Sequence, residues 1–455
     1  MALLPFALLI VYMALFKLDT LLLAVVFFTP LSLNITQIPG LSLGQVGVGV
    51  ALPTEPIMFG AMLLFILRLA HGGIDKKLLR HPVSIVILAG LAWMFITCFT
   101  STMPFVSFKF LIERSWGVVA FYFLGLCLFD KKKNIITFWW LYIISLTGVI
   151  VYAILRHAKG HFAEKPAHDA ATPFYNDHTA YGALLAMFIP IVIGLCFLKT
   201  DNKKGKAIAP FLVGLFIIAI GLSYSRAGWV SLVGALGVFI IMKLKVKLRT
   251  ILVMLIIALG VAFIYQDKII LKLEHNNKEV SEDISTEIQS ISNISSDASN
   301  KERINRWSCA IRMFKDKPWV GFGPGTYQFQ YAPYQLSYNR TIISTNLGNG
   351  GNAHSEYLGP LAEQGVLGML SFLAIVVAIT ILSFNLYYRL EDKELRIIVL
   401  SIYLGLVTYF IHGGMNNFLD TDKAAVPFWG FLGMLVAIDL SYGKKKTEVP
   451  ATLAS

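Results

Sequence analysis

Charged residues are scarce in this chain. They make up 15% of its 455 residues, whereas hydrophobic residues make up 56%, and the mean hydropathy is +0.67. Because soluble domains carry about 25% charged residues, this composition excludes an ordinary soluble protein and indicates a polytopic membrane protein. A chain of this length accommodates about a dozen spans of ~20 residues together with one sizeable loop.

Cysteine is also scarce, and its spacing excludes two kinds of site. The four cysteines form no Cys-x-x-Cys pair, and three of them lie within apolar runs, which argues against both a disulfide framework and a cysteine metal site. Histidine and aspartate show no metal-site spacing either, so we expect no metal. The chain is apolar from Ala2, with no basic n-region and no clear cleavage site, and we expect a retained span there rather than a signal peptide.

The basic excess, a formal net charge of +12, does not indicate nucleic-acid binding. Lysine and arginine gather in every second loop between apolar runs, as expected of cytoplasmic loops under the positive-inside rule. We therefore expect membrane lipids as surroundings and no nucleic-acid partner. The basic loops are at 76–80, 131–133, 203–206, 243–249, 389–396 and 444–446.

The apolar runs predict an all-α integral membrane protein with about 12–13 transmembrane helices. Two short runs precede Leu33, with Lys17 and Asp19 between them, and they form either two spans or a single span or hairpin. The runs are 2–16, 18–33, 53–70, 83–100, 114–129, 135–153, 178–198, 207–222, 229–242, 250–266, 357–386, 397–413 and 425–442.

One long polar segment, 267–355, interrupts the apolar runs. Loop alternation places it outside, together with the connections at 34–52, 101–113, 154–177, 223–228 and 412–424. Residues 277–300 are rich in Ser, Asn and acidic residues and lack aromatics, so we expect them to be mobile. The predicted organisation is an N-terminal transmembrane bundle (1–266), a large external loop with candidate site residues (267–355) and C-terminal transmembrane helices (356–455).

A helix is predicted within this loop, starting at Asp297 or Ser299 and ending before Pro318. Arg303 borders its predicted buried face, whereas Arg306 points further away and is expected to meet solvent. The buried stripe is predicted from four apolar residues at helical spacing, Ile304, Trp307, Ile311 and Phe314.

The sequence Gly-Phe-Gly-Pro-Gly-Thr at 321–326 has the Gly and Pro density of a turn. No Gly-Lys-Ser/Thr follows, and no strand–loop–helix context surrounds it. We therefore favour a turn that shapes the site over a backbone cradle for phosphate.

Several polar residues stand where apolar runs meet the external side. His354 directly precedes an apolar run, where a group that titrates near pH 7 can act, although most lone interfacial histidines are structural. Arg226 lies in a very short external connection, where an arginine either has a function or snorkels to the headgroups. Asp420-Thr421-Asp422 matches the metal-binding Asp-x-Asp of nucleotide-sugar enzymes, but those substrates are cytoplasmic and this connection is external. Other residues that either line a site or are structural are Lys109, Glu113, Arg114, His178, His412, Asn416, Asn417, Asp420 and Asp422.

Three motifs in order resemble the O-antigen ligase and O-antigen polymerase superfamily. They are Ser-Tyr-Ser-Arg-Ala at 223–227, Arg-Ile-Asn-Arg-Trp at 303–307 with Pro-Trp-Val-Gly-Phe-Gly-Pro-Gly-Thr-Tyr at 318–327, and Ala-His-Ser at 353–355 with Gly-Val-Leu-Gly at 365–368. His354 is followed by Ser where Asn is common in the family. The ordered set is fairly specific, although no single motif is, and the many-span layout extends the resemblance beyond about 220–370.

The resemblance implies a metal-independent, inverting glycosyltransferase in the bacterial inner membrane, with its active site facing the periplasm. Such an enzyme moves a glycan from undecaprenyl pyrophosphate to a lipid A–core sugar or a second glycan, without a cofactor. The motifs place the catalytic roles on Arg226, Arg303 and His354, with Arg306 as the alternative to Arg303. The residues expected to contact the substrate are Arg306, Tyr224, Ser355, Tyr357, Lys109, Arg114, His178 and His412.

Under this hypothesis, the arginines stabilise the charge that grows on the leaving pyrophosphate, and His354 takes the proton of the acceptor hydroxyl. The motifs do not choose between a ligase and a polymerase that joins lipid-linked repeat units. A lipid-linked oligosaccharide flippase or transporter is the alternative class. Transporters usually carry ionisable residues at mid-membrane or show repeated halves, whereas the charges here lie almost wholly at span ends and no repeat is evident.

Overall fold

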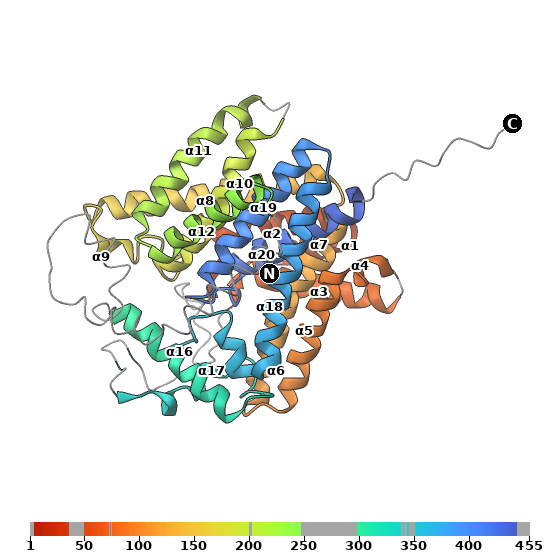
Figure 1. Ribbon diagram of the computed structural model, residues 1–455. Coiled ribbons are helices and arrows are strands. Elements are labelled where there is room, and N and C mark those ends of the chain that lie inside the picture. The colour runs from red at the N-terminus through yellow and green to blue at the C-terminus, as the bar shows by residue number, and fades with distance from the viewer. Residues whose placement is uncertain are drawn as a thin grey trace.

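The protein is described by a computed structural model that covers residues 4–35, 50–71, 73, 75–199, 203–246, 298–337, 340, 344 and 351–443. Across these ranges the chain is almost entirely helical, and nine of the helices are long and apolar enough to cross a membrane (Figure 1). The prediction of an all-α integral membrane protein is confirmed. The run at 250–266 and most of the segment expected to be mobile lie outside the described residues.

The two short N-terminal runs form separate helices, α1 (Leu4–Phe16) and α2 (Leu18–Phe28), with Lys17 between them. At ~1.5 Å per residue, neither spans the ~30 Å hydrocarbon core alone. A short 3-10 turn, η1 (Thr29–Leu31), follows α2. A small antiparallel ribbon that the apolar pattern did not predict, β1 (Leu33–Asn34) with β2 (Ala51–Leu52), then leads into α3 (Thr54–Ala70).

The connection predicted at 101–113 is mostly helical, which corrects that prediction. The helix begins at Pro104, where the missing N–H of proline costs no helical hydrogen bond. Lys109 and Arg114 therefore lie along a helix of 25 residues instead of preceding it. The elements of this part are α4 (Lys76–Leu79), α5 (Pro82–Phe99), α6 (Pro104–Gly117), the π-helical η3 (Val118–Phe123) and α7 (Leu124–Leu128).

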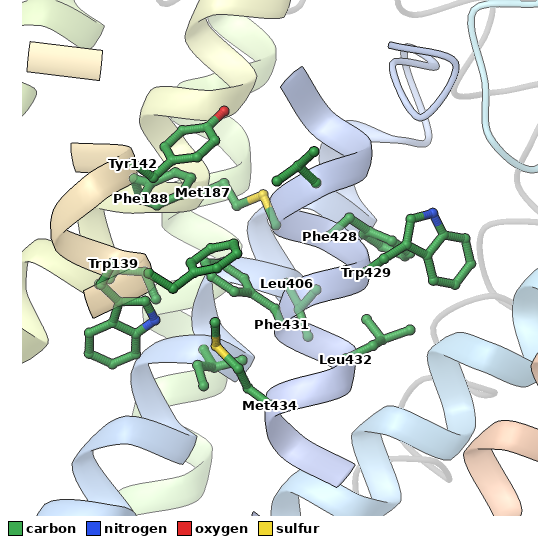
Figure 2. Packing of buried hydrophobic residues seen from close by; sticks show 14 of the residues in the cluster. Trp139, Tyr142, Met187, Phe188, Leu406, Phe428, Trp429, Phe431, Leu432 and Met434 are labelled. Carbon is green, nitrogen blue, oxygen red and sulfur yellow. The ribbon is translucent and has the colours of Figure 1, made fainter. Parts of the chain in front are cut away.

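The remaining helices complete the membrane part and share one core. Side chains of α8, α10, α19 and α20 fill its core (Figure 2), where the rings of Tyr142 and Phe188 stack with centroids 4.2 Å apart. The helices are α8 (Lys132–Ala158), α9 (Glu164–Ala167), α10 (His178–Phe197), α11 (Lys203–Leu222), α12 (Arg226–Lys243), α18 (Leu358–Arg389), α19 (Lys393–His412) and α20 (Asp422–Tyr442).

The predicted basic loops gather at one end of these helices, which we call the basic end. The opposite end, where α10 and α12 begin and α19 stops, is the site end. Residues 247, 249 and 444–446 lie outside the described ranges. The contacts that join the basic loops are those of Asp439 with His81 and Arg389, Glu394 with Lys132 and Lys199, Ser441 with Asp130, and Tyr388 with the Met242 carbonyl.

The helix predicted in the long loop is present as α16 (Ala298–Asp316), and in Figure 1 it lies beside the lower part of α18. Its buried face differs from the predicted stripe, since Ile311 is 43% exposed. The burial pattern was misread because polar residues of this face find partners in distant segments. The residues buried on it are Glu302, Asn305, Arg306, Cys309, Ala310 and Met313.

The residues after α16 form a turn-rich segment that returns to the membrane helices. It holds α17 (Tyr327–Gln330) and the 3-10 turn η4 (Ala332–Tyr334). Residues 321–326, which we call the Gly-Pro turn, contain three glycines with positive φ. The amide groups of Phe322 and Gly323 donate to the carbonyls of Ala362 (3.1 Å) and Glu363 (2.7 Å) in α18.

These hydrogen bonds satisfy main-chain carbonyl groups next to a break in α18. Gly365 has φ 70° and ψ −166°, so the helix is interrupted there. In lipid, a main-chain group freed by such a break needs a protein partner. The Val366 amide donates to the carbonyl of Pro318 (2.9 Å), and the Trp93 indole donates to that of Gln364 (2.9 Å). The Gly-Pro turn and the residues before it thus complete the hydrogen bonding of α18. The predicted turn is present, and its role in shaping the site stays a prediction.

Gly365→Ala is expected to destabilise the protein. A Cβ atom would lie 2.2 Å from the Trp319 carbonyl oxygen, and the positive φ alone costs an L-residue about 1–3 kcal/mol. Thermal unfolding of the purified protein in detergent should show a clear loss relative to Gly148→Ala, a matched helical change with no heavy atom within 4 Å. Equal unfolding temperatures for the two variants would contradict this account of the break.

Candidate functional site

Helix ends bring several predicted site residues to the same end of the molecule. His178 is the first residue of α10, Arg226 is the first of α12, and His412 is the last of α19. His354 lies just before α18. Residues from four separate parts of the chain therefore meet at the site end.

Close packing of α10 against the turn before α12 fixes the position of Arg226. A Cβ atom on Gly182 would lie 2.3 Å from the Cβ of Ser225, so only glycine permits this approach. The Arg226 guanidinium lies 3.8 Å from a carboxylate oxygen of Glu164, and its side chain is 30% exposed. Its charge also acts on His178. The packing thus holds a partly exposed cation beside the start of α10.

Arg303 is the cation at the centre of this group. It is half-buried on α16, and its charge acts on three imidazoles. Asp177, which caps α10 by accepting the amides of Thr179 (2.7 Å) and Ala180 (2.8 Å), supplies a carboxylate near the same rings. The three imidazoles are those of His178, His354 and His412.

The backbone of His354 is held in an unusual conformation, with φ 49°. Left-handed backbone is uncommon for residues other than glycine and tends to occur at functional sites. Two hydrogen bonds hold it: the His354 amide donates to Oδ1 of Asn352 (3.1 Å), and the Trp307 indole donates to the His354 carbonyl (3.2 Å). Trp307 belongs to α16, so this helix positions both Arg303 and His354.

Burial, followed by the positive charges of Arg303 and Arg306, lowers the pKa of His354 to about 4. The nearby carboxylates of Asp177 and Glu302 oppose this shift but do not cancel it. The imidazole is therefore neutral at neutral pH, which is the form that can accept a proton.

A cavity of ≈ 390 Å³ opens beside His354, and we call it the His354 cavity. It lies between the start of α10, the β1–β2 ribbon and the segment before α20. Its lining is rich in amides, carboxylates and aromatic rings, groups that can hydrogen-bond and stack on sugars. The polar and aromatic lining residues include Asn176, Asp177, Tyr175, Phe418, Asn352 and Asn417.

A larger cavity of ≈ 670 Å³, which we call the α6 cavity, lies between α6, α17 and the start of α18. Lys109 and Glu113 form an ion pair of 3.5 Å on its wall. Phe105, at the first turn of α6, also lines it and is 85% exposed. Both cavities share three lining residues, Asn352, Asn417 and Asp420, so they meet next to His354.

Glu356 joins the segment around His354 to the connection between α19 and α20. Its Oε1 accepts the amides of Phe418 and Leu419, both at 2.9 Å, and the hydroxyl of Tyr409 at 2.7 Å. Arg114 approaches its other oxygen at 4.0 Å and pairs with Asp420 at 3.0 Å. Arg114 is thus held by two carboxylates on the wall of the α6 cavity.

Three other predicted contact residues make structural hydrogen bonds. The Tyr224 hydroxyl donates to the carbonyl of Phe162 (3.0 Å), and that of Tyr357 donates to the carbonyl of Phe410 (2.9 Å). Ser355 is 2% exposed, and its Oγ accepts the Tyr357 amide (3.2 Å) at the start of α18. These residues join the segments that carry Arg226 and His354.

The expectation that Arg306 meets solvent is wrong, because Arg306 is only 5% exposed. Its Nε donates to Glu302 at 2.6 Å, and its guanidinium lies 4.2 Å from the centre of the Tyr331 ring. It also reaches the carbonyl of Asn352 (3.4 Å). Arg306 therefore stabilises the fold of the loop beneath His354.

Sequence reasoning missed Asp177, Asn352 and Glu356 as residues around the site, whereas Asn417 was among the candidates. Asp177 had a usable signal, since an aspartate directly before an apolar helix is a typical N-cap. The others lie in connections whose contacts depend on the fold, so their sequence carried no comparable signal.

A comparison with known families adds to this geometry. Residues 211–373 match the family described as O-antigen ligase. The matched range contains Arg226, Arg303 and His354, whereas Lys109, Arg114, His178 and His412 lie outside it. No curated protein sequence matches the chain. The family implies a glycosyltransferase-like activity of ligase or polymerase type on lipid-linked glycans. The apolar helices make the chain a multi-pass membrane protein, and its residues 211–373 carry the similarity to the O-antigen ligase family.

Proposed function

We propose that this protein transfers a glycan from undecaprenyl pyrophosphate to an acceptor sugar at the periplasmic face of the bacterial inner membrane. The observation that carries the proposal is the cluster of Arg303 and His354 at the site end, with Arg226 at the neighbouring helix start. Guanidinium groups bind phosphate in a bidentate manner and stay charged at any physiological pH. The family match supports the lipid-linked donor.

The distribution of charge supports the orientation. The described basic loops share the basic end, which the positive-inside rule assigns to the cytoplasm. The site end then faces the periplasm, where it would meet a donor whose glycan is exposed on the outer leaflet.

Arg303, rather than Arg306, is proposed to bind the pyrophosphate. Arg306 is buried, forms a salt bridge with Glu302 and stacks on Tyr331. Its charge is therefore balanced by a partner within the loop. Arg303 is half-buried and lies beside the imidazoles. With Arg226 it would supply two cations for an anion that carries two phosphates.

His354 is proposed as the general base of a single displacement. Its neutral imidazole takes the proton from the acceptor hydroxyl while that oxygen forms a bond to the anomeric carbon of the donor. The bond from this carbon to the pyrophosphate oxygen breaks, its electron pair stays on the pyrophosphate, and the configuration inverts. Arg226 and Arg303 stabilise the negative charge that develops on the leaving oxygen.

Donor binding would strengthen this base. A group with a pKa of about 4 is a weak proton acceptor, and the cations that lower this pKa are those proposed to bind pyrophosphate. Negative phosphate charge placed beside them raises the pKa of His354. The imidazole thus becomes a better base when the donor is in place.

The two cavities are proposed to hold the two glycans. The donor sugar would occupy the His354 cavity, which contains the imidazole. The acceptor glycan would occupy the α6 cavity and reach His354 across Asn352, Asn417 and Asp420. The exposed Phe105 and Phe329 on the α6 cavity suit an acceptor that is itself presented by a lipid at the membrane surface.

This arrangement fits a lipid A–core acceptor, as in a ligase, and a second lipid-linked repeat unit, as in a polymerase. A glycan ladder from a deletion strain separates them. Loss of long chains with one capped unit retained indicates a polymerase. Loss of all capping, with accumulation of lipid-linked polymer, indicates a ligase.

A flippase is less well supported, because the cluster of cations and imidazoles lies at helix ends on one side.

Replacing His354 with alanine should lower transfer by about 10²–10⁴-fold, the usual contribution of a general base. Arg303→Lys keeps the charge but loses the bidentate geometry, and we expect a loss of about 10-fold or more. Transfer from a purified lipid-linked glycan measures both, and analysis of the new linkage should show inversion. Near-normal turnover in His354→Ala, or retained configuration, would contradict the mechanism.

The pH dependence should differ between the free and the donor-bound enzyme. The base must be neutral, so activity falls as pH decreases through the pKa of His354. We expect this limb near pH 4 in kcat/KM for the donor, which reports the free enzyme, and at higher pH in kcat, which reports the complex. A kcat limb at the same or a lower pH would show that bound pyrophosphate does not act on the imidazole.

Val106→Trp should block the α6 cavity, because Val106 is half-buried on its wall. We expect KM for the acceptor to rise about 10-fold or more, with KM for the donor unchanged. Ile112→Trp is the matched control on the same helix, at an exposed position that does not line the cavity. A selective rise in the donor KM would reverse the assignment of the two cavities. No change in either KM would contradict the assignment of the α6 cavity to a substrate.

A further inference from the structure

A third cavity, of ≈ 450 Å³, lies at the basic end between α8, α10 and α11, far from the proposed chemistry. We call it the lysine cavity. Four lysines line it: Lys132 and Lys133 from the start of α8, Lys199 after α10, and Lys206 of α11. Such a concentration of one charge around a hollow requires a counter-charge or an anionic ligand.

Only part of this charge is balanced within the described chain. Lys132 forms an ion pair with Glu394, which also accepts the Lys199 amide at 3.2 Å. Lys133, Lys199 and Lys206 are exposed, and no ion pair joins their side chains to any carboxylate of the described ranges. Among the described residues, the cavity therefore presents three lysine side chains, those of Lys133, Lys199 and Lys206, that form no ion pair with a carboxylate.

The rest of the wall is apolar and leads toward the middle of the membrane helices. Ile136, Trp140 and Leu141 of α8 face Leu195 of α10 across the cavity. On α8, Ile136 and Trp140 are followed at helical spacing by Ile144, which is 53% exposed. A ligand that fits must carry its negative charge at the mouth and its apolar part along this face.

We propose that the lysine cavity binds an anionic phospholipid, with the phosphate among Lys133, Lys199 and Lys206 and an acyl chain along Ile136 and Trp140. Basic pockets between helices at the cytoplasmic side suit such headgroups. Three cations favour a diphosphatidylglycerol over a lipid with one phosphate. This site does not depend on the proposed glycosyl transfer.

The test compares two triple variants of the full chain in phosphatidylcholine nanodiscs. Lys133→Gln/Lys199→Gln/Lys206→Gln removes the charges of the cavity. The control, Lys76→Gln/Lys77→Gln/Arg80→Gln, removes three charges at the same end that do not line it. Native mass spectrometry with added phosphatidylglycerol or diphosphatidylglycerol measures binding, and inorganic phosphate and undecaprenyl pyrophosphate are added as competitors.

We expect the wild-type chain and the control to bind diphosphatidylglycerol equally and more tightly than phosphatidylglycerol. The cavity variant should bind about 100-fold more weakly, from about fivefold for each of the three lysines lost. Equal loss in both variants would reduce the effect to general surface charge and overturn the proposal. Full displacement by inorganic phosphate, or preference for undecaprenyl pyrophosphate over the phospholipids, would also overturn it.

Discussion

The break in α18 at Gly365 is the constraint on which the arrangement of the site depends. A broken helix in a membrane must find partners for its freed amide and carbonyl groups. Here the partners are main-chain groups of Pro318, Phe322 and Gly323, so the residues that follow α16 are fixed to the first part of α18. This anchoring places α16, and with it Arg303, over the segment that carries His354.

The charges around His354 then determine which chemistry the site can perform. The positive charge of arginines acts on the half-buried imidazoles of His178 and His354, and the carboxylates nearby do not cancel its effect on His354. Under the proposed function, the pyrophosphate of the donor binds beside these cations and raises the basicity of the His354 imidazole. The same charges would therefore serve both to bind the donor and to prepare the base.

Much of the fold followed from sequence, because hydropathy and loop charge respond directly to the membrane. Every predicted apolar run within the described ranges forms a helix, and the basic loops share one end. The errors arose where burial depends on tertiary partners. The buried face of α16 contains Glu302 and Arg306, which satisfy each other, so an apolar stripe did not mark it. The start of α6 at Pro104 was missed because charged residues on its second and third turns interrupt the hydropathy.

The candidate site, like the fold, could be predicted only in part from the sequence. The ordered motifs identified Arg226, Arg303 and His354, and the structure places them among helix ends on one side, but their roles stay proposals. The second cavity and the ties made by Glu356 and Asn352 could not be predicted, because they join segments far apart in the chain.

The most direct measurement is an experimental structure of the protein with undecaprenyl pyrophosphate bound. The account predicts both phosphates at the site end, within hydrogen-bonding distance of the Arg226 and Arg303 guanidiniums and beside the His354 imidazole. Phosphates bound among the lysines of the basic end, or at the site end without contact to either arginine, would contradict it.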